Sequence, residues 1–411
     1  MSEHVLPSMI HAERRAPAWG AVVAVALGAF ALVASEFMPV SLLTPLASDL
    51  RISEGTAGQA ISISGAFALV TSLFISSLSG RLDRKPVMLS LTALMLVSGT
   101  TVAFAPSVAV FMTGRALIGV AIGGFWSMSA AMVMRLVQTE QVPRALAIVN
   151  GGNALATVIA APVGSFLGTI VGWRWAFFCT VPIAAAALAW QWASLPHMPV
   201  HHRKSSRTTL EVFKLFERPA ITLGMVAVSL LFMGQFALFT YLRPFLESVT
   251  HVSASALSFM LLVIGVSGLL GTVLIGKLLR SSVYPVLVVM PLIMALTACG
   301  LVMLGDSKTA TITLLALWGC LGTAAPVGWW TWLARTLPHD AEVGGGLMVA
   351  VIQLAIALGA LVGGVAFDAI GHRATFGLSA ILLALAAVAA AWTSRAARRT
   401  PEREDACSLR R

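Results

Sequence analysis

The sequence predicts an all-α polytopic membrane protein, and three observations carry that prediction. Of the 411 residues, 58% are hydrophobic and 11% are charged, whereas a soluble protein carries about 25% charged residues. Uninterrupted apolar segments of about 20 residues, long enough to cross roughly 30 Å of hydrocarbon, recur from end to end. The sequence lacks the short alternating segments of a transmembrane β-barrel. We therefore expect a bundle of membrane-spanning helices.

Charged stretches and Pro/Gly breaks divide the apolar sequence into twelve expected spans. Six lie in the first half, near residues 18–47, 56–79, 86–105, 107–134, 143–170 and 174–195. Six lie in the second half, near residues 219–246, 253–279, 283–304, 309–335, 344–369 and 373–394. The long polar stretch 196–218 predicts a cytosolic linker between a first half, 18–195, and a second half, 219–394. Residues 1–17 and 395–411 are expected to form tails.

The basic residues predict the orientation of these spans. With both termini inside, the inner segments hold 21 of the 27 Lys and Arg residues. The outer segments hold five, namely Arg51, Arg174, Arg243, Lys308 and Arg373. Such asymmetry is typical of the positive-inside rule. The net charge of +10 is thus explained by membrane orientation, and no nucleic-acid partner is expected. Four widely separated cysteines without a zinc-binding spacing predict neither a metal site nor a disulfide.

The two halves repeat each other at offsets of 196 to 200 residues. The echoes include "SGRLDRKP" with "IGKLLRSS" and "ASEFMPVSLLTPL" with "MGQFALFTYLRPF". Two like-oriented repeats predict an axis along the membrane normal, with a site between the halves near the midplane. The matched residues are Gly80 and Gly276, Arg135 and Arg335, Pro45 and Pro244, and Glu36 and Gln235.

Glu36 is the one charged residue between Ala16 and Ser48. An acidic side chain inside a span costs about 2.5–3.5 kcal/mol on insertion scales, so such residues usually serve a function. We expect Glu36 to bind and release a proton and to contact substrate. Pro39 and Pro45 follow it, and because proline lacks an N–H, they free the carbonyls of the residues four positions earlier. The alternative is a structural glutamate bonded to a neighbouring helix.

Arg115 is the second charge inside a span. A buried guanidinium must satisfy five donors, and Glu36 with the carbonyls freed by Pro39 and Pro45 are the natural acceptors. We expect Arg115 to take part in proton coupling together with Glu36. A purely structural brace is the alternative.

Neutral polar and aromatic residues inside the spans are candidates for substrate contact. Amides beside aromatic faces suit a neutral, hydroxylated, ring-bearing solute. The predicted substrate-binding residues, besides Glu36, are Trp126, Asn150, Asn153, Gln235, Tyr241 and Gln353.

Two further segments are expected to move or bend. Gly80, Asp83 and Arg84 belong to a short turn between spans, where Asp83 can bond the start of the next helix; with Gly276 they are predicted to form a gate. Pro162 and Gly164 are predicted to bend the span at 143–170.

Neither a phosphate-binding loop nor a catalytic Ser/His/Asp or zinc motif occurs. We therefore expect a protein that is not an enzyme, needs no cofactor and draws its energy from a proton gradient.

The combination of spans and motifs in this sequence resembles the major facilitator superfamily over the whole chain. "GRLDRKP" resembles the superfamily's loop motif, and "MTGRALIGVAIGG" a helix motif whose arginine corresponds to Arg115. "APVGSFLG" is similar to the antiporter motif, with Ala161 where a glycine is usual. An acid nine residues before a proline, here Glu36 and Pro45, is similar to the drug:proton antiporter pattern.

Within that superfamily, "EFMPVSLLTPLASDL", "GGFWSMSAAMVMRLV", "GQFALFTYLRPF" and "PVGWWTW" resemble bacterial purine ribonucleoside efflux pumps. The resemblance implies a monomer in the bacterial inner membrane that exports nucleosides such as inosine and guanosine in exchange for protons. Sugar exporters share part of the first segment, and a multidrug exporter of the same architecture is the nearest rival. An uncoupled facilitator and a non-transporting membrane sensor are further alternatives.

Overall fold

The computed structural model describes residues 18–79, 83–198, 218–337 and 341–408. Within them, twelve helices or helix pairs are long and apolar enough to cross a membrane, which confirms the predicted fold class. The helices of the N-terminal half are α1 (Trp19–Leu50), α2 (Glu54–Ser79), α3 (Arg84–Ala103), α4 (Val108–Leu136), α5 (Val142–Ile170), α6 (Gly172–Phe178) and α7 (Thr180–Ser194), with a short 3-10 turn η1 (Thr139–Gln141). Those of the C-terminal half are α9 (Pro219–Thr240), α10 (Leu242–Ser248), α11 (Ala254–Ser281), α12 (Tyr284–Leu304), α13 (Lys308–Thr336), α14 (Ala341–Ile370) and α15 (His372–Ser408).

Most observed bounds lie within about three residues of the expected spans, and the differences have local causes. The expected span 174–195 consists of α6 and α7, which are separated at Cys179. The span 219–246 consists of α9 and α10, separated at Tyr241 three residues before Pro244, because proline cannot donate to the carbonyl of Thr240. Helix α15 continues past the predicted end of its span as far as Ser408.

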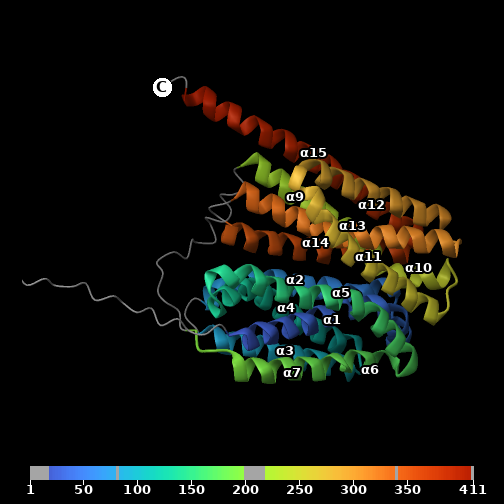
Figure 1. Cartoon of the computed structure of the whole chain (residues 1–411). Helices are drawn as coiled ribbons and strands as arrows, with labels where there is room; N and C mark the ends of the chain where they lie inside the picture. Colours follow the sequence, from blue (N-terminus) through green and yellow to red (C-terminus); the bar gives the residue numbers. More distant parts are fainter. Residues whose placement is uncertain (1–17, 80–82, 199–217, 338–340, 409–411) are drawn as a thin grey trace, which may run out of the picture.

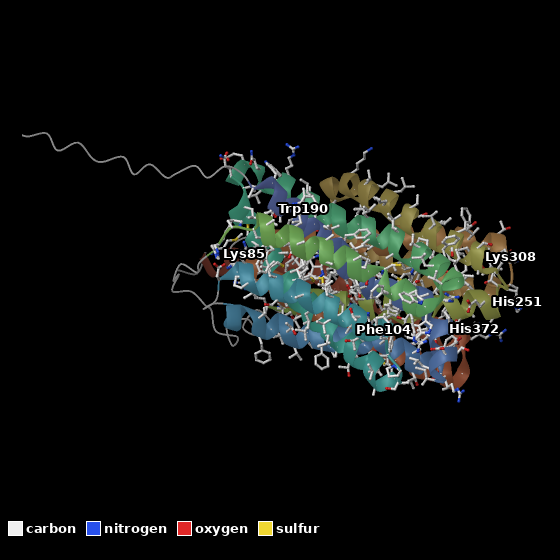
Figure 2. All side chains as sticks on the ribbon, turned by 90° about the horizontal axis from the view of Figure 1, so that it is seen from below. Lys85, Phe104, Trp190, His251, Lys308 and His372 are labelled. Atoms are coloured by element: carbon white, nitrogen blue, oxygen red, sulfur yellow. The ribbon has the colours of Figure 1, made fainter. Side chains whose placement is uncertain are left out.

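The two halves form adjoining bundles, drawn from blue to green and from yellow to red in Figure 1. Helix α14 packs along α2, and α11 packs along α5. We call the end where α7 stops at Ser194 and α9 starts at Pro219 the linker end, and the opposite end the far end. Lys85 lies at the linker end, whereas His251, Lys308 and His372 lie at the far end (Figure 2).

Large apolar side chains cover the outside of the bundle. Phe74, Val273 and Met303 are 67%, 68% and 80% exposed, an arrangement that suits hydrocarbon rather than water as the surrounding solvent. The inside is packed as well, because α1 is buried along most of its length. The core of the C-terminal half also includes Val40 and Ile61 of the N-terminal half.

Glycines allow α2 and α4 to approach each other closely. A Cβ atom added at Gly119 would lie 2.9 Å from the Cβ of Phe67 and 2.9 Å from the Cα of Ser64. Small residues at such crossings are the usual means of packing helices in a membrane. One turn later, Gly123 faces Ala68 in the same way.

We expect Gly119→Ala to destabilise the folded protein by about 1–3 kcal/mol, because the added methyl group overpacks this crossing. The measurement is thermal unfolding of the detergent-solubilised variants. Gly151→Ala is the matched control, since a Cβ at Gly151 would meet no atom within 4 Å. Equal melting temperatures for the two variants would contradict the close approach of α2 and α4.

Candidate functional site

The two prolines inside α1 each leave a carbonyl without a helical donor, and an arginine fills each place. Pro39 cannot donate to Ser35, and Pro45 cannot donate to Ser41. Nη1 of Arg115 donates to the Ser35 carbonyl oxygen at 2.9 Å, and Nη1 of Arg243 donates to the Ser41 carbonyl oxygen. The predicted use of a proline-freed carbonyl by Arg115 is confirmed. The use of the second carbonyl by Arg243 was not expected from the sequence.

Arg115 joins three helices of the N-terminal half. It is 0% exposed, and its Nε donates to the Ala60 carbonyl of α2 at 3.3 Å. Nη2 donates to the Ser64 hydroxyl at 3.3 Å and to the main-chain carbonyl of Glu36 at 3.4 Å. The guanidinium therefore bonds the backbone around Glu36 and also attracts its carboxylate electrostatically. It braces the helix that carries the acid.

The Glu36 side chain lies next to Gln353 of α14, so the acid reaches the opposite half. Glu36 is partly exposed, although Ser35 and Met38 on either side of it are buried. Gln353 is 6% exposed, and its side chain interacts with the Glu36 carboxyl. Its Nε2 makes no hydrogen bond of good geometry within the part of the chain that the structure describes. The structure thus brings together three of the predicted site residues, Glu36, Arg115 and Gln353.

A cluster of three phenylalanines lies directly beside this group and joins the halves. The rings of Phe37 and Phe236 are stacked with centroids 6.1 Å apart, and Phe239 meets both edge-on at 6.1 and 6.2 Å. Phe37 follows Glu36 in α1, whereas Phe236 and Phe239 belong to α9. The sequence analysis did not single out Phe37 or Phe239, although their position beside Glu36 and Gln235 was a usable signal.

Gln235 presents an unused acceptor near the phenylalanine cluster. Its Nε2 donates to the Gly322 carbonyl of α13 at 3.4 Å, which fixes the orientation of the amide. Its Oε1 is buried and has no hydrogen-bond partner among the described residues. An acceptor held in this way requires a donor from a ligand or from water.

The other predicted contact residues are distributed over several surfaces. Trp126 of α4 is partly exposed and packs, like Phe37, against an apolar cluster formed by Val33, Ala34, Ala156 and Ala160. Asn153 of α5 is half-buried, and Asn150 is exposed one turn nearer to the linker end. Both lie on the same helix as Pro162 and Gly164.

Tyr241 occupies a different position from the one expected for a substrate contact. Its side chain is 0% exposed, and its hydroxyl donates to the carbonyls of Ala360 at 2.9 Å and Gly55 at 3.3 Å. Its ring stacks on Phe367 with centroids 5.2 Å apart. Tyr241 therefore joins the start of α10 to α2 and α14 at the far end. Because its hydroxyl is buried and bonded to both helices, no ligand can reach it in this conformation.

The bend predicted in α5 lies at a contact with both neighbouring helices. Pro162 is inside α5, and Gly164 faces α1, where an added Cβ would lie 2.7 Å from the Ser41 hydroxyl. Pro162 leaves the Val158 carbonyl without its helical donor, and Val158 is the residue against which Gly265 of α11 packs. The α5 motif therefore contacts α1 and the opposite half.

Of the predicted gate, Gly80 lies outside the described residues, and the remainder is at the linker end. Asp83 caps α3 by accepting a hydrogen bond from the Lys85 N–H at 2.9 Å, as predicted. It also accepts the Met198 N–H at 3.0 Å and contacts the His197 ring at 3.1 Å. The Arg84 N–H lies 3.5 Å from the Met198 carbonyl. Gly276 is exposed, and a Cβ there would meet no atom within 4 Å.

Asp83 is negatively charged over the physiological range. Partial burial acts to raise the pKa of Asp83, but the hydrogen bonds from Lys85 and Met198 and the His197 ring hold it below its ordinary value of 3.8. A carboxyl whose pKa is depressed on folding contributes its full stabilisation above the unfolded pKa. That contribution is lost only as the pH falls below about 3.8 and through the folded pKa.

We expect Asp83→Ala to release the segment at Met198, because alanine has no oxygen to accept the Lys85 and Met198 N–H groups, which both donate to Oδ1 of Asp83. Hydrogen exchange of the Met198 amide at pH 7 should accelerate about five-fold, the effect of losing one such bond. The exposed Glu140 at the same end provides the control variant Glu140→Ala. Unchanged exchange in Asp83→Ala would show that the cap does not hold this segment.

Several hydrogen bonds between the halves lie toward the far end. Asp368 of α14 accepts from the Ser53 hydroxyl at 2.6 Å and from the Gly55 N–H at 2.9 Å, so it caps α2 of the other half. The bonds of Tyr241 and Arg243 to the N-terminal half lie nearby. The two halves are therefore fastened to each other at the far end.

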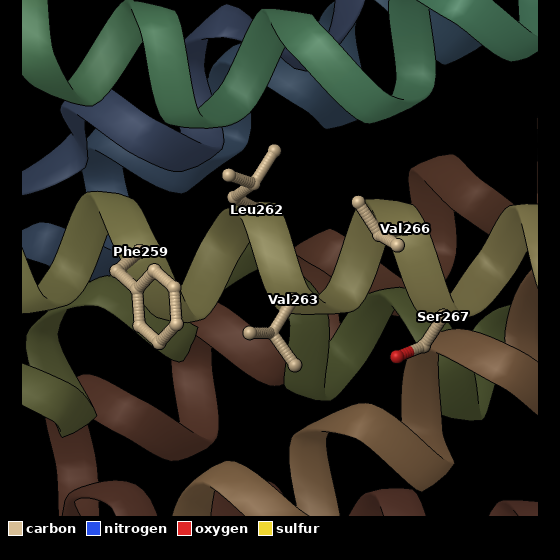
Figure 3. Close-up of a pocket in the computed structure, with 5 residues that line it drawn as sticks. All are labelled: Phe259, Leu262, Val263, Val266 and Ser267. Carbon is tan, nitrogen blue, oxygen red and sulfur yellow. The ribbon is translucent and has the colours of Figure 1, made fainter.

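An apolar hollow on α11 does not belong to this site. It is lined by Phe259, Leu262, Val263, Val266 and Ser267, beside α5 (Figure 3). Ser267 is the one hydroxyl among these five residues. Phe259 is 57% exposed, as expected of a surface that faces lipid.

Comparison with known proteins identifies the architecture. The family model of the Major Facilitator Superfamily matches residues 25–360. The chain belongs to the Major Facilitator Superfamily. A solved structure of a D-xylose-proton symporter has the same fold, with a TM-score of 0.74 at 16% identity, covering 91% of this chain and 96% of that one. The expected membership is confirmed, and the chain is a multi-pass membrane protein of a transporter superfamily.

Two relatives match almost the full length of the chain. A Pseudomonas aeruginosa protein named Transcription regulatory protein OpdE is 58% identical over 378 residues, which is 92% of this chain and 94% of OpdE. The Purine ribonucleoside efflux pump NepI of Salmonella typhimurium is 41% identical over 375 residues, which is 91% of this chain and 94% of NepI.

Proposed function

We propose that this superfamily member is a secondary active transporter that exports purine ribonucleosides, such as inosine and guanosine, in exchange for protons. The observation that carries the substrate class is the 41% identity to NepI over 91% of the chain. We further propose that it acts as a monomer in the bacterial inner membrane and uses no cofactor. The proton gradient is the energy source.

The surroundings of Glu36 support a role in proton exchange. Glu36 lies inside a span at the contact between the halves, beside Gln353, and its backbone is held by Arg115. Ionisable residues within membrane spans commonly bind transported protons. A proton on Glu36 neutralises the carboxylate and so weakens its attraction to Arg115 and alters its contact with Gln353. Because Gln353 belongs to the opposite half, proton binding can in this way change the relative position of the two halves.

The neighbouring side chains support a nucleoside as the exported solute. The phenylalanine cluster offers apolar ring faces for a base, and Oε1 of Gln235 has no hydrogen-bond partner among the described residues. Aromatic rings with a few placed polar groups are typical of sites for small planar ligands. Trp126, Asn150 and Asn153 extend the polar and aromatic surface toward the linker end and are proposed contacts of the solute.

The contacts between the halves support an alternating-access cycle with the linker end in the cytosol. Basic residues such as Lys85, Arg135 and Arg144 lie near the linker end, and the positive-inside rule assigns that end to the cytosol. The linker and both tails are then cytosolic. In that orientation the far-end contacts between the halves lie on the periplasmic side.

OpdE gives a reason to consider a second function, because its name describes a transcription regulatory protein. A membrane protein can influence transcription indirectly when it changes the internal concentration of an inducing solute. A chain that only senses its ligand would bind nucleoside without moving it. Sugar and multidrug export remain the alternatives within transport.

Uptake of labelled inosine into everted membrane vesicles separates these possibilities. We expect guanosine in excess to suppress energised uptake and a lipophilic cation or a disaccharide to leave it unchanged. Competition by the lipophilic cation alone would support multidrug export, and competition by the disaccharide would support sugar export. Inosine binding without uptake would favour the sensor.

A further inference from the structure

Arg243 is a charged residue in an unexpectedly enclosed position. It lies in α10 near the far end and is 7% exposed. Its Nε donates to the carboxylate of Glu247, one turn later, at 2.8 Å. Its Nη1 donates to the Ser41 carbonyl of α1, in the opposite half. The sequence analysis had counted this residue among the outer charges, whereas the structure places it between the halves.

The acceptor of Arg243 exists because of Pro45. In a regular helix the N–H of residue 45 would donate to the carbonyl of residue 41, but proline has no N–H. Ser41 is 0% exposed. Its hydroxyl donates to the Met38 carbonyl and therefore does not supply the donor that the Ser41 carbonyl lacks. A buried carbonyl without a donor is unfavourable. Arg243 supplies the missing donor.

The arrangement differs from that of Arg115 in one decisive respect. Arg115 bonds the carbonyl freed by Pro39 from within the same half, so its bonds can persist through a transport cycle. Arg243 bonds the carbonyl freed by Pro45 from the opposite half, so separation of the far ends must break its bond. The two prolines of α1 thus create one permanent acceptor and one that is satisfied only when the far end is closed.

We propose that Arg243 is the positioning residue that holds the far end closed, by replacing across the interface the helical hydrogen bond that Pro45 removes from α1. Glu247 orients the guanidinium for that contact. The inference rests on the proposed alternating-access transport, and it assigns to Arg243 the control of which side of the site is open.

The test measures accessibility of the far end in purified protein in detergent, where a thiol reagent reaches both ends. The four native cysteines, Cys179, Cys299, Cys320 and Cys407, are first replaced by serine. A reporter cysteine then replaces Ile61 of α2, which is 2% exposed and packs into the core of the opposite half. A second reporter, at the exposed Gly151 of α5, lies away from the contacts between the halves and serves as the reference for general unfolding.

We expect Arg243→Gln to accelerate labelling at Ile61→Cys about five-fold or more, the size of a typical coupling between two states, and to leave labelling at Gly151→Cys unchanged. Arg174→Gln is the matched control. Arg174 is also an arginine near the far end, but it bonds Asp49 and the Ala105 carbonyl within its own half. Arg174→Gln should leave both labelling rates unchanged.

A second variant, Pro45→Ala, keeps Arg243 but gives the Ser41 carbonyl a donor within its own helix. Pro45→Ala restores an N–H that can bond the Ser41 carbonyl within α1, so the contact with Arg243 weakens and labelling at Ile61→Cys should also rise. The effects of Pro45→Ala and Arg243→Gln should be less than additive, because both act on one hydrogen bond. Fully additive effects would overturn the proposal.

Unchanged labelling at Ile61→Cys in a folded Arg243→Gln protein would also overturn the proposal, as would an equal rise in Arg174→Gln. The readout requires no substrate and no gradient. A protein that fails to transport inosine can therefore still confirm or overturn the role of Arg243, and the two proposals fail independently.

Discussion

Glu36→Gln is expected to abolish the proton-driven accumulation of inosine in everted vesicles. One proton moving down about 100 mV supplies roughly 2.3 kcal/mol, enough for about a 50-fold concentration ratio. Glutamine imitates the protonated acid but cannot release a proton, so the ratio should fall to about one. Exchange of labelled for unlabelled inosine, which needs no net proton movement, should persist. The two assays are run on the same vesicle preparations.

Glu140→Gln is the control for this prediction, since Glu140 is an exposed acid at the linker end, in η1. It should accumulate inosine as the unaltered protein does. Uncoupler-sensitive accumulation by Glu36→Gln at the full ratio would show that another group carries the proton. If Glu36→Gln lost both inosine exchange and inosine accumulation, Glu36 would be assigned to solute binding as well.

Arg115→Gln and Arg115→Lys are both expected to destabilise the protein and to stop transport. The four acceptors of Arg115 belong to α1 and α2 and surround a fully buried guanidinium. The planar guanidinium of arginine points its N–H groups toward acceptors in several directions. The ammonium group of lysine is a single point charge and cannot reach all four acceptors. Hydrogen bonds within membranes contribute about 0.6 kcal/mol each on average and up to about 1.7. We therefore expect a loss of about 2–5 kcal/mol.

The measurement is the free energy of unfolding in mixed detergent micelles, with labelled inosine exchange as the functional assay. Arg144→Lys is the control, because Arg144 is exposed and lies over the Trp19 ring at 5.2 Å from its centroid. Arg115→Lys with normal stability and exchange would contradict the bracing role derived from the geometry.

The parts of the site that follow from local chemistry were predictable. The missing N–H of Pro39 defines a free acceptor at Ser35 without knowledge of the fold, and Arg115 was the one basic residue inside the spans that could use it. The cap that Asp83 forms on α3 is local in the same sense. The twelve spans were predictable because hydrocarbon imposes both their length and their composition.

The parts that depend on the meeting of the halves were not predictable. Arg243 lies near the end of a span, so charge counting assigns it to an outer loop, and its acceptor is 202 residues earlier in the chain. Tyr241 was selected as a polar residue in a span, but the packing of α2 against α14 encloses its hydroxyl. Phe37 became notable through its stacking on Phe236 of the other half. A single sequence does not specify these long-range pairings.

The most direct test of proton exchange for nucleoside uses purified protein in liposomes that enclose a pH-sensitive dye. An inosine gradient directed into the liposomes should drive protons out, so the lumen should become alkaline in the absence of any other energy source. Liposomes with Glu36→Gln should show no pH change while still exchanging labelled inosine. An unaltered protein that exchanges inosine without moving protons would contradict the account.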